Sequence, residues 1–512
     1  MDAIRLKNLQ SLTDTGAVNL KSINLLVGQN SSGKSTFLRV FPLLKQSIET
    51  DTISPILWYG NLVDFGTFKD AHSRNATSST ISFEMTSTID LGNRNMHFAS
   101  RRLVSNTALD RLQVKVLLEV EETSRHDYTR PKSIALTFLE NDVSFELDSS
   151  SRVSAVRINT RNVSDLFEDV QFIQRNSLLP SFASKRKRRG PLDVDSTIYD
   201  RLFSELKRVS RSRTTENIED IISALQLSSR AQMLEQLKEL NPPTPTWKSQ
   251  VDTWEVTNSD FALIYDLVIA RFTELIYELA EYYLYATIQN FNYIAPLRAS
   301  AERYYRVQGL AVREVDAQGL NLAMFIRNLS TDMRRRLNSW LLENFDFELM
   351  AQLDGGHLSL KLKQPGTSEL TNLADMGFGF SQLIPILVQL WVMSSRHRTV
   401  RQRASSYVFA IEQPELHLHP RLQAKLADVF IASIQAAEKI RVDLKLILET
   451  HSETMINRFG SRIADGDFRH DNISVILFEK DTASSQSIVT STGYDKEGIL
   501  VQWPYGFFEP EQ

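Results

Sequence analysis

The spacing of hydrophobic residues changes along the chain, and each change predicts a different kind of structure. Within residues 1–48 the apolar runs at 3–12 and 23–28 read as strands, and residues 35–49 have apolar positions at helical spacing. From about residue 79 to residue 160, short segments of alternating polarity are separated by polar turns. These segments predict an antiparallel sheet: TISFEMTST, MHFASRRLV, LQVKVLLEVE, SIALTFLE and VSFELD.

The middle of the chain reads as helical over 161–292, with breaks at LLPSFASKRKRRGPLD (178–193) and at the proline-rich NPPTPTW (241–247). The segment 259–291 is apolar on most sides, which predicts a helix buried in a helical subdomain rather than a two-stranded coiled coil. From about residue 370, helices alternate with continuous apolar strands. That pattern is typical of a buried parallel sheet.

Strands and helices alternate at both ends of the chain, so we predict that the two ends fold together into one α/β domain. A chain of 512 residues also exceeds what one hydrophobic core usually organises. We therefore expect three parts. They are an N-terminal lobe with its β subdomain at 1–160, a helical insertion at 161–292 and a C-terminal lobe at 293–512.

Composition excludes several classes of protein. The absence of cysteine rules out disulfides, thiolate catalysis and cysteine-ligated metal centres. A formal net charge of -4 gives no global attraction to nucleic acid, so any such contact must be regional. The N-terminus lacks the apolar core of a signal peptide, and no apolar stretch approaches the roughly 18 residues of a membrane span. We expect a cytoplasmic protein that makes no membrane contact.

The stretch GQNSSGKST at 28–36 has the spacing of a phosphate-binding loop and lies between a predicted strand and a predicted helix. Gly28 and Gly33 let the backbone curl so that successive N–H groups face the phosphates of ATP. Lys34 is expected to reach the terminal phosphates and Ser35 to bind Mg²⁺, a pair that an ordinary glycine-rich turn does not explain. The predicted nucleotide ligands in this loop are Gly28, Asn30, Ser31, Ser32, Gly33, Lys34, Ser35 and Thr36.

A second motif, SSYVFAIEQPELHLHP at 405–420, places Glu412 and Gln413 at the end of an apolar strand. Glu412 stands where a Walker-B carboxylate should hold Mg²⁺. Gln413 stands where many such ATPases have the carboxylate that polarises the attacking water, and an amide cannot take a proton. Hydrolysis is then expected to be slower by about 10²–10⁴-fold, unless Glu415 or His451 acts as the base instead.

A third motif, DMGFGFSQ at 375–382, opens an apolar helix with glycines and a serine, which makes a second anion-binding surface. One nucleotide scarcely needs two such surfaces from one subunit. We therefore predict that Gly379 and Ser381 complete the site of a neighbouring copy, so that ATP is held between two chains. The alternative is a helix N-cap with glycines that allow tight packing.

A fourth motif, LKLILETHSETMINRF at 444–459, is a strand followed by His451 and then a helix. A histidine at this edge of the sheet can hydrogen-bond the γ-phosphate or the attacking water, because α/β folds gather their ligands there. Two other histidines, His417 and His419, stand in the turn after Glu415. They either cap and pack that turn or take part in catalysis.

These four motifs, in this order, resemble the ABC-type ATPases of the RecF, Rad50 and OLD group. More narrowly, the chain is similar to the ATPases of the Septu anti-phage system and its retron-associated relatives, with the PARIS ATPase close by. Three further stretches carry the narrower resemblance, whereas residues 80–290 carry little of it. They are LVDFGTFKD (62–70), YIAPLRASAERYY (293–305) and the ending WPYGFFEPEQ (503–512).

The resemblance implies an ABC-type ATPase head in which ATP and Mg²⁺ are held between subunits of a homo-oligomer. OLD-type relatives continue into a nuclease domain, but only about thirty residues follow ISVILFEKD here, too few for such a domain. Septu relatives pair with a separate HNH nuclease, so the resemblance implies such a partner. Two alternatives stay open: a RecF- or Rad50-like ATPase of DNA maintenance, and a nucleotide-locked scaffold with negligible turnover.

A run of five cations in the predicted insertion is a candidate nucleic-acid contact. Serine, glycine and proline border the run, which suggests an exposed loop that could neutralise phosphates. An ordinary solvated surface loop is the alternative. The residues of the run are Lys185, Arg186, Lys187, Arg188 and Arg189.

Overall fold

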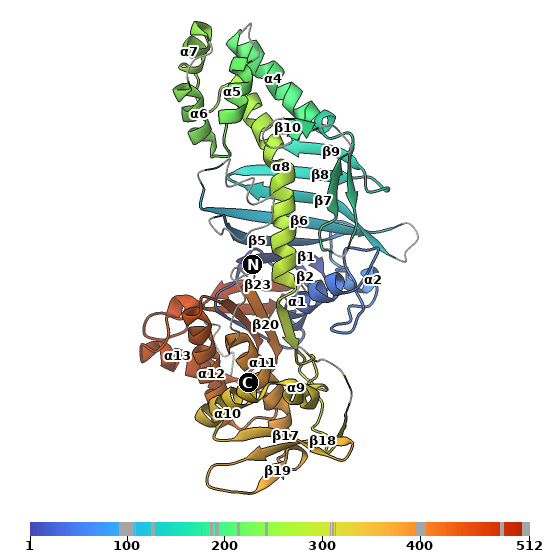
Figure 1. Ribbon diagram of the computed structural model, residues 1–512, viewed down its shortest axis with the longest axis vertical. Coiled ribbons are helices and arrows are strands. Elements are labelled where there is room, and N and C mark those ends of the chain that lie inside the picture. The colour runs from blue at the N-terminus through green and yellow to red at the C-terminus, as the bar shows by residue number, and fades with distance from the viewer. Residues whose placement is uncertain are drawn as a thin grey trace.

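The computed structural model describes most of the chain, and it is elongated (Figure 1). An α/β unit lies between a large antiparallel sheet with its helices on one side and a small four-stranded sheet on the other. The described residues are 1–91, 107, 109–123, 128–175, 177–184, 188–189, 194–211, 216–240, 244–307, 309, 312, 314–395, 406–481 and 486–503.

The α/β unit is built on a six-stranded sheet that joins the two ends of the chain, as the sequence predicts. Its first five strands are parallel and its last is antiparallel to its neighbour. Strand β4 comes from the N-terminal part of the chain and lies between β21 and β22, which come from the C-terminal part. All six residues of β4 are buried. In spatial order the strands are β15 (Phe291–Ile294), β20 (Ser406–Glu412), β21 (Asp443–Glu449), β4 (Ile23–Gly28), β22 (Ile473–Lys480) and β23 (Ser487–Thr492).

Helices cover both faces of this sheet, because side chains alternate between the faces along each strand. On β4, Leu26 packs into the same core as Phe37 and Phe41 of α1 (Lys34–Glu49). Its neighbours Leu25 and Val27 belong to the core on the opposite face. The helices on that face are α11 (Phe378–Ser395), α12 (Pro420–Lys439) and α13 (Glu453–Ala464).

The predicted antiparallel sheet is present, and it extends to the N-terminal strand of the chain. Its order is β10-β9-β8-β7-β6-β5-β1-β2, with the short β3 (Val18–Asn19) also paired to β1. The expected strand at 96–104 lies outside the described residues. The strands are β1 (Ala3–Leu9), β2 (Leu12–Asp14), β5 (Thr80–Asp90), β6 (Arg111–Glu122), β7 (Thr129–Phe138), β8 (Asn141–Leu147), β9 (Val153–Ile158) and β10 (Arg161–Asn162).

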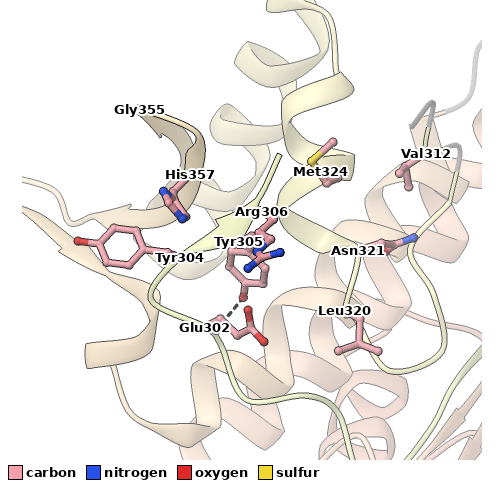
Figure 2. A pocket seen from close by; sticks show the side chains of 10 residues that line it. All are labelled: Glu302, Tyr304, Tyr305, Arg306, Val312, Leu320, Asn321, Met324, Gly355 and His357. Atoms are coloured by element: carbon pink, nitrogen blue, oxygen red, sulfur yellow. Dashed lines mark hydrogen bonds between the residues drawn. The ribbon is translucent and has the colours of Figure 1, made fainter. Parts of the chain in front are cut away.

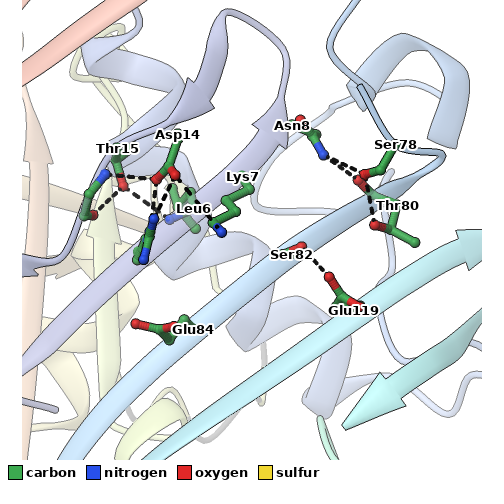
Figure 3. A network of polar contacts seen from close by, with 12 residues as sticks. Leu6, Lys7, Asn8, Asp14, Thr15, Ser78, Thr80, Ser82, Glu84 and Glu119 are labelled. Carbon is green, nitrogen blue, oxygen red and sulfur yellow. Dashed lines mark hydrogen bonds and ion pairs between the residues drawn. The ribbon is translucent and has the colours of Figure 1, made fainter. Parts of the chain in front are cut away.

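Polar side chains of β1, β2, β5 and β6 make contacts on this sheet (Figure 3). Arg5 donates two hydrogen bonds to Asp14, at 2.8 and 2.6 Å. On the neighbouring pair of strands, Ser82 donates to a carboxylate oxygen of Glu119 at 3.2 Å. Cross-strand pairs of this kind help to fix the register in which the strands align.

The long helix α8 (Ser259–Ile288) crosses the antiparallel sheet in Figure 1. It is largely buried, as predicted for residues 259–291, but it packs on this sheet as well as on α4 (Ser196–Ser210) rather than within a helical subdomain alone. Two buried polar groups connect the helix to the sheet. The hydroxyl of Tyr265 accepts a hydrogen bond from Asn141 at 2.9 Å, and Asp266 accepts from Asn159 and Arg161 at 2.8 and 2.9 Å. These bonds satisfy groups that would otherwise be costly to bury.

The helical prediction is wrong for the residues from 161 to the predicted break at 178, where the structure has strands and one 3-10 turn (Ser164–Leu166) in place of an α-helix. The strands β11 (Val170–Ile173) and β12 (Ser181–Ser184) form a hairpin, and β13 (Arg188–Arg189) pairs with β14 (Val194–Asp195). In the hairpin, Phe172 and Phe182 are directly paired, and both rings pack on Tyr277 of α8, at 5.3 and 5.9 Å. A strand pair offers two aromatic rings to one helix in this way.

The helices of the insertion begin only after these strands. They are α4 (Ser196–Ser210), α5 (Glu216–Ala224), α6 (Arg230–Glu239) and α7 (Pro245–Val251), which precede α8. Whether the insertion is a domain of its own, with the boundaries 161 and 292, stays a prediction.

Residues 305–372 form a small subdomain that the hydrophobic pattern did not reveal. It contains α9 (Leu322–Asn328), α10 (Thr331–Phe345) and a sheet of β16 (Tyr305–Arg306), β17 (Glu348–Asp354), β18 (His357–Lys363) and β19 (Leu370–Asn372). None of the helices in the described ranges combines the length and the apolar character needed to cross a membrane.

Candidate functional site

The predicted phosphate loop connects β4 to α1 in the conformation that its glycines permit. A Cβ on Gly28 would stand 2.1 Å from the backbone oxygen of Phe478 on the paired strand β22, so a larger residue cannot fit there. Gly33 has a φ of 100°, in the left-handed region, and a Cβ on it would come within 2.8 Å of Leu12. Ser31 is also left-handed, with a φ of 60°. The loop is therefore tightly curled before α1 begins at Lys34.

Lys34 is buried and its ammonium is held by neutral groups of the loop. Nζ donates to the backbone oxygens of Gly28 and Gln29, at 2.9 and 2.7 Å. Burial lowers the pKa of Lys34 because the charged form is poorly solvated. An anion bound at the loop would compensate this buried charge.

The loop lines a pocket of about 360 Å³, and most of the predicted nucleotide ligands face it. Among them, Thr36 donates to the side chain of Gln10 at 2.6 Å. Gly28 is absent from the lining because it ends β4. The lining residues are Gln10, Ser11, Asn30, Ser31, Ser32, Gly33, Lys34, Ser35, Thr36, Gln413, Glu449 and His451.

A larger pocket, of about 860 Å³, lies in the small subdomain and contains none of these residues. Figure 2 shows its aromatic side: Tyr304 and His357 lie near each other with ring centroids 6.0 Å apart, and the hydroxyl of Tyr305 accepts from the backbone of Glu302. Its lining has no glycine-rich loop at a helix N-terminus. Size therefore does not identify the nucleotide pocket, whereas the chemistry of the lining does.

Glu412, which is expected to hold the metal, is bound here by side chains of α1 and β15, and its metal role stays a prediction. Its carboxylate accepts two hydrogen bonds from Arg39, at 2.7 and 2.8 Å, and one from the hydroxyl of Tyr293 at 2.7 Å. Its backbone oxygen accepts from Arg298 at 2.9 Å. In the sheet, β21 lies between β20 and the phosphate-loop strand β4.

Glu449, which sequence reasoning did not select, ends the strand next to β4 and is the carboxylate that touches the loop. Ser35 donates to its Oε1 at 2.8 Å. Its Oε2 is buried without a hydrogen-bond partner among the described residues. Burial and the nearby charge of Glu412 raise the pKa of Glu449 to about 7. The signal in the sequence was an acidic residue directly after the apolar run Leu446–Leu448.

The remaining candidates on this edge divide into those that reach the pocket and one that does not. Gln413 and His451 line it, and the backbone N–H of Gln413 donates to the carbonyl of Glu449 at 2.9 Å. Burial, followed by the charge of Lys34, lowers the pKa of His451. Glu415 lies outside the lining and accepts from the backbone N–H of His451 at 2.7 Å. Burial raises the pKa of Glu415.

The glycine and serine signature packs against the turn that follows β20 and does not line the loop pocket of its own chain. A Cβ on Gly379 would stand 2.8 Å from the backbone oxygen of His417. Ser381 lies inside α11 rather than at its cap, and it lines a separate small pocket with Ser300 and Pro385. Gly379 thus allows close packing within its own chain, and its contact with the nucleotide of a neighbouring copy stays a prediction.

The two histidines of this turn have structural contacts. The ring of His417 lies 4.8 Å from that of Phe378, edge to face. His419 caps α12 by accepting from the backbone N–H of Arg421 at 3.3 Å. These contacts correspond to the capping and packing alternative. Of the basic run, Lys185, Arg186 and Lys187 lie outside the described residues, and Arg188 and Arg189 form β13.

The residues of the loop pocket fit a magnesium nucleotide. The curled loop and the buried Lys34 suit a phosphate chain, and the unpartnered oxygen of Glu449 suits a cation. Across the described ranges, no three acidic or histidine side chains gather into a metal site. Mg²⁺ in nucleotide sites is usually held by one or two carboxylates together with phosphate oxygens.

Solved structures of SMC heads are similar to this chain over most of its length. One is the SMC head bound to the C-winged helix domain of ScpA, at 10% identity and TM-score 0.35, covering 96% of this chain and 98% of that chain. A second is the SMC head with an extended coiled coil bound to the C-terminal domain of ScpA derived from Pyrococcus furiosus. It has 10% identity and a TM-score of 0.34, and the match covers 96% of this chain and 96% of that chain. A third is the SMC head from Thermotoga maritima, with 9% identity and a TM-score of 0.33, and the match covers 96% of this chain and 97% of that chain.

No curated protein matches the chain by sequence. The family of AAA ATPase domains matches residues 1–456, a range that contains the phosphate loop, Gln413 and His451. The α/β fold class predicted for an ABC-type ATPase head is confirmed. The structure has a parallel sheet with the phosphate loop at the carboxyl end of β4, an annexed antiparallel sheet, and helices that follow this antiparallel sheet in the chain. The chain belongs to the AAA ATPase domain family and is an ATPase.

Proposed function

We propose that the chain binds ATP with Mg²⁺ at the phosphate loop and hydrolyses it slowly. The observation that carries this proposal is the loop pocket, where a buried lysine and a curled backbone face Gln413 and His451. Lys34 and the loop N–H groups bind and orient the phosphates, and the hydroxyl of Ser35 is a ligand of the metal. When bound, Mg²⁺ neutralises the charge that develops on the phosphates.

Gln413 is expected to limit the rate of hydrolysis, because an amide can orient a water molecule without accepting its proton. The Gln413→Glu variant should therefore release phosphate about tenfold faster than the wild type. This is less than the full contribution of a general base, since the new carboxylate is not held in place by partners. Steady-state phosphate release at saturating ATP measures the effect.

The matched control for this variant is Gln423→Glu, on the next helix, which should leave the rate unchanged. Gln423 binds Ser452 and the backbone of Leu418 and does not line the pocket. An unchanged rate in Gln413→Glu would contradict our interpretation of Gln413 and favour a nucleotide-locked scaffold.

We further infer that a second copy of the chain completes the site through Gly379 and Ser381. In support, neither residue lines the loop pocket of its own chain. The Ser381→Arg variant should bind ATP as well as the wild type, but it should not form ATP-dependent dimers, because the long cation would occupy the space of the partner's phosphates. Light scattering with and without ATP measures this. Normal dimers in the variant would rule out the shared site.

The defence role rests on the sequence resemblance to Septu-type ATPases. On that basis the nucleotide state of the oligomer controls a separate nuclease of the HNH type, in a cytoplasmic complex. The Ser381→Arg variant tests this as well. Proteins that co-purify with the wild-type chain should include a nuclease, and its cleavage of DNA should respond to ATP with the wild-type chain and not with the variant.

A further inference from the structure

Two neighbouring parallel strands end in buried carboxylates, on the same side of the sheet as the phosphate loop. Glu412 of β20 and Glu449 of β21 are in register, and both residues are buried. An ATPase of this family needs one protein carboxylate near the Mg²⁺ of its nucleotide. The contacts of the two side chains decide which of them is available.

Glu412 is fully engaged as an anchor between β20 and α1. Arg39 lies one helical turn after Ser35 on α1 and binds both oxygens of Glu412, while Tyr293 of β15 binds one of them. A bidentate pair of this kind is strong and fixed in geometry. For Glu412 to bind a metal, Arg39 would have to leave a carboxylate that is buried on β20.

Glu449 has the opposite properties. Its strand is the direct neighbour of β4, and one oxygen touches Ser35, the predicted metal ligand of the loop. Its other oxygen is buried and has no partner among the described residues.

We propose that Glu449, rather than Glu412, is the protein carboxylate that holds the Mg²⁺ of the bound nucleotide. Glu412 is then a positioning residue that fixes α1, and with it Ser35, against the sheet. This proposal rests on the proposed binding of ATP and Mg²⁺ at the loop.

The first test measures metal and nucleotide binding separately. Mn²⁺ replaces Mg²⁺, and its affinity for the complex of protein and a non-hydrolysable ATP analogue is measured by electron paramagnetic resonance. The Glu449→Gln variant should lose at least about tenfold in Mn²⁺ affinity. Its affinity for a fluorescent ATP analogue in EDTA should equal that of the wild type, since Lys34 and the loop are unchanged.

Two matched variants complete this test. Glu412→Gln should lose less Mn²⁺ affinity than Glu449→Gln, and Glu453→Gln, on the exposed first turn of α13, should lose none. A larger loss in Glu412→Gln than in Glu449→Gln would overturn the proposal. If the wild type binds no analogue with or without metal, the proposed function itself fails, which is a different result.

A second test uses the unaltered chain, so it does not depend on the folding of any variant. Crystals grown with Mn²⁺ and the analogue should show an anomalous peak within about 2.2 Å of oxygens of Ser35 and Glu449, the distance expected for direct ligands of such ions. The Arg39 and Glu412 pair should be intact. A peak bound directly by Glu412, with Arg39 turned away, would refute the assignment.

Discussion

The Lys34→Ala variant should lose at least about 100-fold in ATP affinity. Lys34 is the cation of the loop pocket, and its ammonium at present binds only the carbonyls of Gly28 and Gln29. In the complex it would exchange these for two charge-assisted hydrogen bonds to phosphate, which contribute about 1.5–3 kcal/mol each. Titration with a fluorescent ATP analogue, in EDTA and in Mg²⁺, measures the loss.

The control for this experiment is Lys439→Ala, which removes an exposed lysine from the last turn of α12. It should bind ATP like the wild type. Circular dichroism must show that Lys34→Ala is folded, because the loop also loses two internal hydrogen bonds. A folded Lys34→Ala variant that binds ATP with undiminished affinity would place the nucleotide somewhere other than this loop.

Periodicity in the sequence predicted most of the α/β unit, because its strands are buried and its helices are long. The runs at 23–28 and 444–450 are rich in apolar residues, as expected of strands covered on both faces, and they correspond to β4 and, shifted by one residue, to β21. The same reasoning placed the phosphate loop between a strand and a helix. It also placed Gln413 and His451 at one edge of the sheet, where both line the pocket.

The strand order and the partners of the two carboxylates could not be predicted, and the proposed metal site depends on these contacts. The sequence shows that Glu412 and Glu449 both end apolar strands, but it does not show which strand adjoins β4. The partner of Glu412 was equally hidden, because Arg39 is 373 residues away in the chain. An arginine on the exposed side of a helix gives no signal that it will pair with a buried acid.

Short strands in the middle of the chain were missed for a related reason. The hairpin of β11 and β12 has four residues in each strand, too few for a period of two to stand out from a helical pattern. Its stability comes from Phe172 and Phe182, which pack on Tyr277 about a hundred residues later. Only the tertiary contact distinguishes such a segment from a helix.

The Arg39→Ala variant should destabilise the sheet around β20 by roughly 2–3 kcal/mol. Removing one partner of a buried ion pair typically costs 3–5 kcal/mol, because the other charge stays buried. We expect less here because the side chain of Arg39 is 39% exposed and water can partly replace it, whereas that of Glu412 is 3% exposed. Hydrogen exchange of the β20 amides measures this local stability in a chain that need not unfold in one step.

Replacing Glu412 in the same background separates the charge from the packing. In the Arg39→Ala, Glu412→Gln double variant no buried charge is left behind, and the amide oxygen can still accept the hydrogen bond from Tyr293. The double variant should therefore recover at least about 1 kcal/mol relative to Arg39→Ala alone, which is the coupling expected of residues in direct contact. If Arg39→Ala costs as much in the Glu412→Gln background as in the wild type, Glu412 is not held by Arg39. Its carboxylate would then be available to a metal, and the anchor role of Glu412 would have to be abandoned.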